Sequence, residues 1–307
     1  MTECERIIKE GILPEIFFEE EVRCDFLVTK ERKKIWAVLL DMMMIFDDIC
    51  RRNHLTYFLS GGTLLGAVRH QGFIPWDDDI DINMKRDDYE KLLRLSNEFK
   101  EPYFLQNPYT DKEAFYSYTR LVNIKTTAFS RMFAYQEMKH GLFIDIFPMD
   151  NWREEDEARF EQIKALNREN STYMRRNNPN LNEEDIKRVM NWSKQNPLEV
   201  YEQIQTLAQK DNNLNTDYLM AGVITNYSFQ KKLRPRQAYD QAVEYDFEGF
   251  KFLGPVDADS VLKGQYGDYM QLPPTDKRAK LGVWHENAIY DPDIPFSDYL
   301  IHYRKNR

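Results

Sequence analysis

The chain has 307 residues, of which 42% are hydrophobic and 30% are charged, and its formal net charge is −9. This length accommodates one large α/β domain with additions, or two modest domains, and the composition is that of a globular protein with a well-solvated surface. The negative charge argues against nucleic acid as a partner, because the overall field would repel its phosphates.

Neither export nor membrane insertion is indicated by the sequence. The first residues, Met-Thr-Glu-Cys-Glu-Arg, lack the apolar core of a signal peptide, and no stretch approaches the ~20 apolar residues of a membrane span. Cys4, Cys24 and Cys50 show no Cys-x-x-Cys spacing and are expected to remain reduced thiols. We therefore expect a cytoplasmic protein without a membrane span.

A strand, a glycine turn and a helix are predicted after an amphipathic helix that spans about 33–53. The strand covers 55–59, Gly61-Gly62 makes a sharp turn, and a short helix follows, with Ser60 or Thr63 near its N-cap. Such a turn aims free backbone N–H groups at one point, where they and the helix dipole favour an anion such as phosphate.

An acidic strand is predicted next, over 79–84. In Asp79-Ile80-Asp81-Ile82 the two carboxylates share one face of the strand, while the isoleucines point into the core. Adjacent carboxylates repel unless a cation lies between them, and hard oxygen ligands suit Mg²⁺ or Mn²⁺. The alternative is that Asp77-Asp78-Asp79 is a solvated acidic turn, but a turn does not require the alternation that follows.

The following segment contains a predicted helix over 87–100 and strands over 103–106, 116–123 and 128–131. Arg120 and Lys125 lie in this segment, and their residue type alone is compatible with surface charge or with phosphate binding.

Asp145 lies in a further strand, between Ile144 and Ile146. A carboxylate buried among apolar residues is costly without a partner, so Asp145 is expected to meet a cation or a hydrogen-bond donor. Asp150 is interpreted as the N-cap of the next helix.

A charged, glycine-free region from 153 to about 215 predicts several helices, broken at 177–180 and at 196–197. A β-hairpin with strands at 243–247 and 250–253 follows it. The last predicted helix begins near Pro255 and ends at Gly267.

Two strings of residues identify a family. Residues 60–81 contain Ser-Gly-Gly-Thr-Leu-Leu-Gly-Ala-Val-Arg-His and Gly-Phe-Ile-Pro-Trp-Asp-Asp-Asp-Ile-Asp, and residues 266–274 contain Tyr-Gly-Asp-Tyr-Met and Leu-Pro-Pro. Both resemble the LicD family of phosphotransferases, a branch of the nucleotidyltransferase fold that includes fukutin-related protein. Asp79 follows Gly62 at a longer distance than is usual in the superfamily, and the extra segment, 69–76, is the part most typical of LicD members.

The resemblance implies an α/β (α+β) fold, with a nucleotidyltransferase-like mixed β-sheet flanked by helices and an added helical subdomain. We expect four regions along the chain. They are an N-terminal extension (1–32), a catalytic core (33–152), a helical insert (153–240) and a C-terminal segment (241–307) that completes the catalytic domain.

The resemblance also implies a metal-dependent enzyme that moves a phospho-alcohol group from a CDP-activated alcohol, most often CDP-choline, onto a hydroxyl of a glycan or lipid-linked glycan, with release of CMP. Acceptors in the family include lipopolysaccharide, teichoic acid and capsule. Mg²⁺ or Mn²⁺ would be held by the catalytic residues Asp79, Asp81 and Asp145. The implied substrate-binding residues are Ser60, Gly61, Gly62, Thr63, Arg69, Trp76 and Lys125.

Two other functions stay open at this point. A true nucleotidyltransferase would attack a nucleoside triphosphate and release pyrophosphate, and a non-catalytic module would only bind a nucleotide. For a choline substrate, Trp76, Tyr116 and Tyr118 are possible walls of an aromatic cage. A lone histidine such as His285 is more often structural than catalytic.

Overall fold

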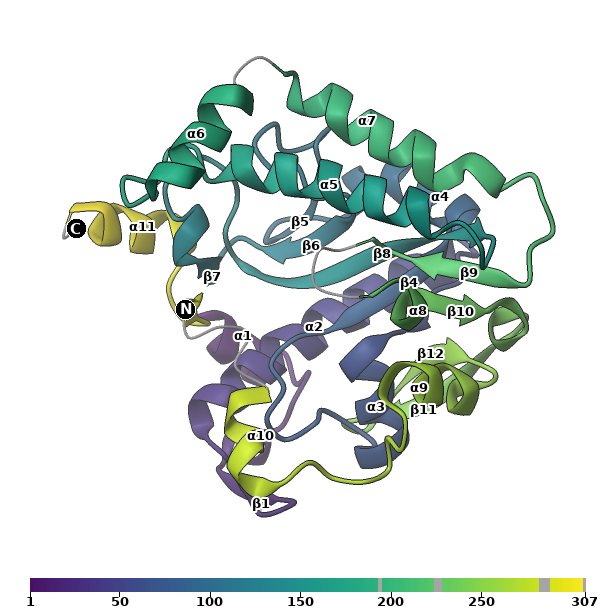
Figure 1. The fold of residues 1–307 in the computed structure, drawn as a ribbon. Helices are drawn as coiled ribbons and strands as arrows, with labels where there is room; N and C mark the ends of the chain where they lie inside the picture. Colours follow the sequence, from purple (N-terminus) through teal and green to yellow (C-terminus); the bar gives the residue numbers. More distant parts are fainter. Residues whose placement is uncertain (193–194, 224–227, 282–287, 306–307) are drawn as a thin grey trace.

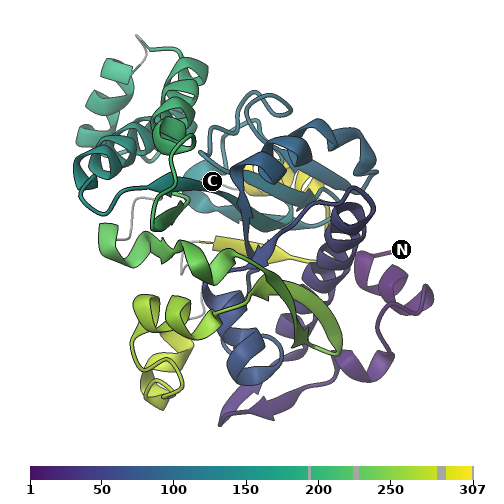
Figure 2. The ribbon, with the colours of Figure 1, turned by 90° about the vertical axis from the view of Figure 1, so that its right-hand side faces the viewer.

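The computed structural model describes residues 1–192, 195–223, 228–281 and 288–305. A mixed seven-stranded sheet lies at its centre, with helices on both faces (Figure 1, Figure 2). The expected mixed sheet flanked by helices is therefore confirmed. Its strands, in chain order, are β3 (Phe58–Leu59), β4 (Asp81–Lys85), β5 (Tyr103–Gln106), β6 (Thr119–Asn123), β8 (Leu142–Trp152), β9 (Tyr218–Ala221) and β10 (Leu233–Pro235).

Strand β8 organises the sheet because it pairs along both of its edges. One edge pairs in parallel with β4, in a register that places Asp81 opposite Asp145. The other edge pairs antiparallel with β6 over the first half of β8 and with β9 over the second half. Residues from four separate stretches of the chain consequently meet around the middle of β8.

Helix α2 (Lys30–Arg52) covers one face of the sheet and confirms the predicted amphipathic helix. It begins three residues earlier than expected because Thr29 caps it, with the Thr29 side chain accepting a hydrogen bond from the Arg32 N–H. Trp36 and Phe46 on its inner side are completely buried.

Three predicted elements beside the glycine turn differ from their expected bounds. Strand β3 covers only Phe58–Leu59 of the predicted 55–59. Helix α3 (Gly61–His70) begins at the glycines, with Ser60 at its N-cap. Strand β4 begins at Asp81, so Asp79 lies in the extended segment before it. That segment still joins the sheet, because the Asp145 N–H donates to the Ile80 carbonyl.

Helix α4 (Arg86–Arg94) is shorter than predicted and is followed by a 3₁₀ turn, η2 (Ser96–Glu98), where Ser96 and Asn97 are weak helix formers.

Helices α5 (Glu157–Met174), α6 (Glu183–Trp192) and α7 (Pro197–Ala208) form a layer on the other face of the sheet, as Figure 1 shows. The breaks between them fall where they were predicted, and Asn196 caps α7. Part of this layer has its own apolar core, in which Trp152 of β8 packs with Phe160 and Ile204.

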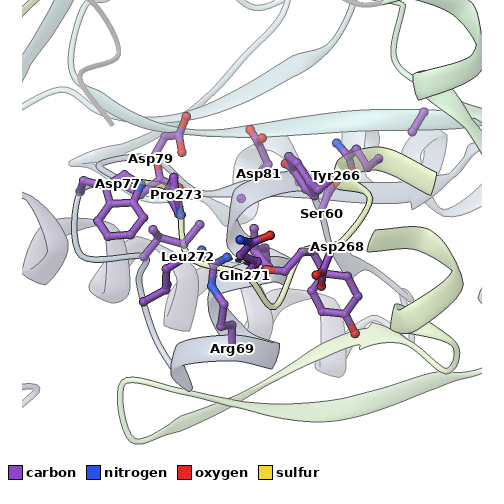
Figure 3. A pocket seen from close by; sticks show the side chains of 18 of the residues that line it. Ser60, Arg69, Asp77, Asp79, Asp81, Tyr266, Asp268, Gln271, Leu272 and Pro273 are labelled. Atoms are coloured by element: carbon purple, nitrogen blue, oxygen red, sulfur yellow. Dashed lines mark hydrogen bonds between the residues drawn. The ribbon is translucent and has the colours of Figure 1, made fainter. Parts of the chain in front are cut away.

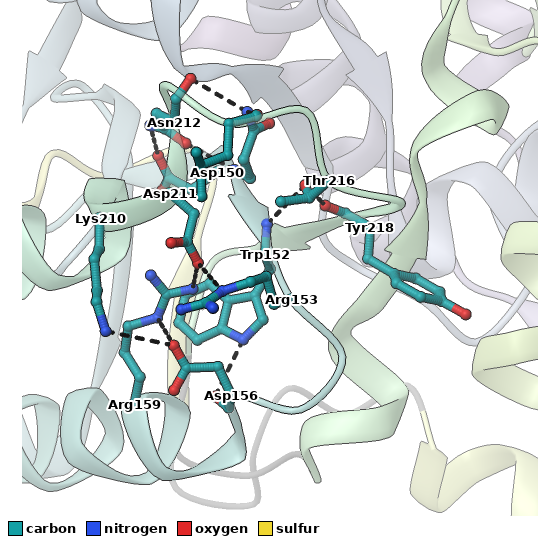
Figure 4. Close-up of polar contacts among 12 residues, drawn as sticks. Asp150, Trp152, Arg153, Asp156, Arg159, Lys210, Asp211, Asn212, Thr216 and Tyr218 are labelled. Atoms are coloured by element: carbon teal, nitrogen blue, oxygen red, sulfur yellow. Dashed lines mark hydrogen bonds and ion pairs between the residues drawn. The ribbon is translucent and has the colours of Figure 1, made fainter.

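Polar contacts join this layer to the end of β8 (Figure 4). Asp150 accepts hydrogen bonds from Asn212 Nδ2 at 2.7 Å and from Arg86 Nε at 2.8 Å. The interpretation of Asp150 as a helix N-cap was therefore wrong, since β8 continues to Trp152 and Asp150 bridges the sheet and the chain after α7. Asp211 accepts from Arg159 at 2.8 Å.

The C-terminal part of the chain returns to the glycine turn. The predicted hairpin is confirmed as β11 (Ala242–Phe247) and β12 (Phe250–Pro255), and helix α9 (Ala258–Tyr266) ends at Gly267, which has a φ of +70°. Both the hairpin and α9 pack against α3.

The remaining elements are peripheral. They are α1 (Glu3–Lys9), η1 (Glu15–Phe18), β1 (Glu21–Arg23), β2 (Phe26–Val28), β7 (Thr127–Ser130), η3 (Arg131–Phe133), η4 (Gln209–Asp211), α8 (Phe229–Lys232), η5 (Arg236–Tyr239), α10 (Thr275–Leu281), β13 (Ala288–Asp291) and α11 (Phe296–Lys305). Within the described ranges, every helix is too short or too polar to cross a membrane.

Candidate active site

A cavity of about 660 Å³ lies where α3, the start of β4, β10 and the segment after α9 meet. Figure 3 shows Asp79 and Asp81 on the wall of this cavity together with residues from the C-terminal segment, Tyr266 to Pro273. Six of the predicted site residues besides Asp81 also line the cavity. They are Ser60, Gly61, Gly62, Arg69, Trp76 and Asp79.

Three predicted residues do not line the cavity. Thr63 lies beneath it, where its Oγ1 accepts a hydrogen bond of 2.9 Å from the Asp81 N–H and fixes the start of β4. Asp145 lies beside Asp81 on β8 and is 9% exposed. Lys125 is exposed in the turn between β6 and β7, so the structure does not bring it to the cavity.

The glycine turn is pressed against two of the carboxylates. A Cβ atom added to Gly61 would lie 2.9 Å from Asp81 Oδ2, and one added to Gly62 would lie 2.6 Å from Asp77 Oδ2. Gly61 also has a φ of +55°, which other residues adopt only with strain. Close approach therefore requires both glycines, and backbone conformation requires glycine at position 61 as well.

Arg120 on β6 holds Asp145. Its Nε donates to Asp145 Oδ1 at 2.8 Å, and its guanidinium carbon lies 3.9 Å from the ring centres of both Tyr116 and Phe143. Residue type left the role of Arg120 open between surface charge and phosphate binding, whereas the structure buries it as the partner of a carboxylate. Tyr116 and Tyr118 surround this guanidinium and do not line the cavity.

Negative charge accumulates in this part of the protein. Burial, followed by repulsion from Asp145, raises the pKa of Asp79 to about 6. Burial, followed by the charges of Asp79 and Asp145, raises the pKa of Asp81 well above its ordinary value. Burial also raises the pKa of Asp145, although the charge of Arg120 opposes this effect. A group of carboxylates with too little compensating positive charge favours a bound cation.

The cavity offers a metal ion two carboxylates, those of Asp79 and Asp81. In the part of the chain that the structure describes, no three His, Cys, Asp or Glu side chains are grouped so that they could hold a metal ion. Mg²⁺, however, is usually bound through one or two carboxylates together with waters and substrate phosphates. Asp79 and Asp81 are two such carboxylates on one cavity wall, so they suit a metal ion that binds with a phosphorylated substrate.

The C-terminal segment closes the cavity opposite the aspartates. Arg69 Nη1 donates to the Tyr269 carbonyl at 2.6 Å, and Arg278 Nε donates to the Pro273 carbonyl at 2.8 Å. The string Tyr-Gly-Asp-Tyr-Met…Leu-Pro-Pro, which carried part of the family resemblance, thus supplies cavity wall through Tyr266, Asp268 and Leu272. His285 lies outside the described residues.

Several lining residues were not found from the sequence, and four of them bear on the chemistry of the cavity. Asn83 lies on β4, Lys232 at the end of α8, Arg234 on β10 and Gln265 on α9. Burial, and then the positive charge of Arg234, lower the pKa of Lys232 to about 7, although the charge of Asp81 opposes this shift. Of these four residues, only Asn83 could have been predicted from its neighbours in the sequence. It continues the alternation of Asp79 and Asp81 and therefore lies on the same face of the chain.

Known proteins are similar to this chain over the residues that build the cavity. A family model described as the LicD/FKTN/FKRP nucleotidyltransferase domain matches residues 54–187, which include the glycine turn, Asp79, Asp81 and Asp145. The lipopolysaccharide cholinephosphotransferase LicD of Haemophilus influenzae is 29% identical over 254 residues, which cover 78% of this chain and 91% of that protein. An uncharacterised protein of Rickettsia prowazekii is 34% identical over 117 residues, which cover 38% of this chain and 40% of that protein.

The fold, the glycine turn and the facing aspartates, taken with these similarities, define a transferase with a nucleotidyltransferase-type domain. Residues 54–187 match the nucleotidyltransferase domain of the LicD family. The resemblance and the enzyme class predicted from the sequence are thereby confirmed.

Proposed function

We propose that this enzyme transfers phosphocholine from CDP-choline to a hydroxyl group of a cell-surface glycan or its precursor and releases CMP. The observation that carries the proposal is the cavity itself, in which the backbone of a glycine turn and two half-buried aspartates face a common space large enough for a small phosphorylated ligand. The similarity over most of its length to a lipopolysaccharide cholinephosphotransferase supports the choice of phosphocholine.

In the proposed reaction, the acceptor oxygen attacks the phosphorus atom that carries choline. A bond forms between this oxygen and phosphorus, the bond between phosphorus and the bridging oxygen breaks, and CMP leaves with the bonding electrons. The proton of the acceptor hydroxyl passes to the carboxylate of Asp145, which Arg120 orients through its Nε. Because Asp145 lies behind Asp81 and does not line the cavity, a water molecule would relay this proton. Mg²⁺ or Mn²⁺, bound by Asp79 and Asp81 with the diphosphate, would neutralise the negative charge that this transfer develops.

The remaining residues bind and orient the donor. Ser60, Gly61 and Gly62 are placed at the start of α3, where backbone N–H groups and the helix dipole favour a phosphate oxygen. Trp76 lines the cavity, and its aromatic ring is the proposed contact of the choline cation.

The test is an assay of CMP release by the purified protein with CDP-choline, Mg²⁺ and candidate glycans. CDP-ethanolamine, CDP-ribitol and CDP-glycerol serve as competing donors, and EDTA removes the metal. CMP release that needs both an acceptor and Mg²⁺ is expected with CDP-choline. Pyrophosphate release from a nucleoside triphosphate, without CMP release from any CDP-alcohol, would instead indicate a nucleotidyltransferase.

A further inference from the structure

Several polar atoms at one end of the cavity lack hydrogen-bond partners. Among the described residues, Asn83 Nδ2 and Oδ1, Arg234 Nε and Gln265 Oε1 are buried without a partner, and all three residues line the cavity. The buried Tyr239 hydroxyl, which neighbours Asn83 and Arg234, also has no hydrogen-bond partner. Buried polar groups are nearly always paired, so a cluster of unpaired ones points to a bound polar ligand or to water.

Three elements that are distant in sequence bring this cluster together. Asn83 lies two residues after Asp81 on β4, Arg234 lies on β10 and Gln265 lies on α9, which packs against β10 and α8 (Figure 1). Arg234 Nη1 donates to the carbonyls of Lys231 at 2.6 Å and Leu233 at 3.1 Å. These bonds fix the guanidinium and leave its Nε available to a ligand.

Two positive charges lie side by side in this cluster. Lys232 is 7% exposed and Arg234 is 2% exposed, and both line the cavity. Two buried cations repel each other, and Asp81, whose charge acts on Lys232, also faces Asp79 and Asp145. An additional anion next to Lys232 and Arg234 would relieve their repulsion and would accept hydrogen bonds from Arg234 Nε and Asn83 Nδ2.

We infer that Asn83, Lys232 and Arg234 form a phosphate-binding subsite of the cavity, next to Asp81 and separate from the glycine turn. The subsite takes the phosphate of a phosphate ester, which belongs either to the nucleotide half or to the phospho-alcohol half of the donor. This assignment rests on the proposed function for the identity of the ester. The cavity then contacts a diphosphate at two places, with backbone N–H groups at the turn and with cationic side chains at the subsite.

Calorimetric titration of the purified full chain in EDTA tests the subsite. The probes are CMP and phosphocholine, compared with cytidine and choline, which lack the phosphate. The wild type is expected to bind at least one phosphate ester more tightly than its dephosphorylated counterpart. Lys232→Met and Arg234→Gln are each expected to weaken that binding about tenfold or more, because each removes a charge-assisted contact. Lys231→Met, which changes the exposed neighbour of Lys232, is the matched control and should bind like the wild type.

The two probes also identify the source of the phosphate. Weakened binding of CMP alone assigns the nucleotide phosphate to the subsite, and weakened binding of phosphocholine alone assigns the phospho-alcohol phosphate. Unchanged affinity for both probes in Lys232→Met and Arg234→Gln would overturn the inference, as would a wild type that does not distinguish phosphate esters from cytidine and choline.

Asn83→Leu provides a test that does not change charge. Its amide has no hydrogen-bond partner to lose, so an apolar side chain of similar size should leave the melting temperature at or above that of the wild type. The same change should weaken phosphate-ester binding about threefold or more, since one donor is lost. Wild-type affinity for both esters in this variant would contradict a ligand contact at Asn83.

The inference and the proposed function fail in different ways. A wild type that binds CMP or phosphocholine through Lys232 and Arg234 but releases no CMP from CDP-choline would refute the transfer and retain the subsite. Turnover of CDP-choline with an unchanged KM in both variants would refute the subsite and retain the transfer.

Discussion

Asp81 on β4 and Asp145 on β8 lie directly opposite each other in the parallel strand pair at the centre of the sheet. Two carboxylates in this register repel each other, and burial on both strands strengthens the repulsion. Arg120 neutralises Asp145 from the other edge of β8, through its 2.8 Å hydrogen bond. Asp81 is therefore the member of the pair that remains directed to the cavity, next to the backbone of Gly61.

Asp79→Asn and Asp81→Asn are each expected to lower CMP release by about a hundredfold or more, because each removes a charge that faces the reacting diphosphate. The melting temperature should be unchanged or higher, since each change also relieves repulsion between neighbouring carboxylates. Enzyme assays and thermal melting on the same preparations test both expectations. Wild-type turnover in either variant at limiting Mg²⁺ would show that the metal does not depend on that residue.

Two substitutions distinguish a catalytic role of Asp145 from a structural one. If Asp145 accepts the proton of the acceptor, Asp145→Asn should lower kcat by orders of magnitude while the affinity for the donor changes much less. Asp145→Ala should lower kcat equally and should also destabilise the protein by about 3–5 kcal/mol, because the buried Arg120 loses the carboxylate that accepts its Nε hydrogen bond. A kcat near the wild-type value in Asp145→Asn would reduce Asp145 to a structural partner of Arg120.

Gly61→Ala should impair activity through the position of Asp81. The new Cβ would lie 2.9 Å from Asp81 Oδ2 and would sit on a residue with a φ of +55°, at a cost of about 1–3 kcal/mol. Gly264→Ala on α9 is the matched control, because nothing lies within 4 Å of its added Cβ and alanine favours a helix. We expect Gly264→Ala to keep full activity with slightly higher stability, and equal activities of the two variants would contradict this account of Gly61.

His140 is expected to make folding stability depend on pH. Its burial lowers its pKa to about 4, while its Nε2 lies 3.1 Å from the Gln136 carbonyl oxygen. Between about pH 6.5 and pH 4 the unfolded chain therefore binds a proton at this residue that the folded chain does not, so stability falls as the pH falls through this window. The full effect of the lowered pKa is about 3 kcal/mol.

Denaturant unfolding at several pH values, for the wild type and for His140→Gln, tests this dependence. The difference in stability between the two proteins should change across the window, whereas the contributions of the buried aspartates cancel in the comparison. A difference that is independent of pH would show that His140 binds a proton equally well in the folded and unfolded chains.

Much of this protein was determined by local sequence. The glycine turn, the alternation of Asp79 and Asp81, the amphipathic pattern of α2 and the hairpin β11–β12 each depend on neighbours within a few residues. Such patterns identify elements and the family, because periodicity and turn chemistry are local properties. Errors at the boundaries arose where capping decided them, as with Thr29 at the start of α2.

Only the tertiary structure decided which charges meet. Arg120 and Lys125 are similar basic residues five positions apart in the sequence, yet β6 places Arg120 against Asp145 while the turn after it leaves Lys125 in solvent. Lys232 and Arg234 reach the cavity that Asp81 lines because β9 and β10 extend the sheet and α8 and α9 pack beside them. Strand order and burial determine these long-range contacts, so the local sequence around each residue could not predict them.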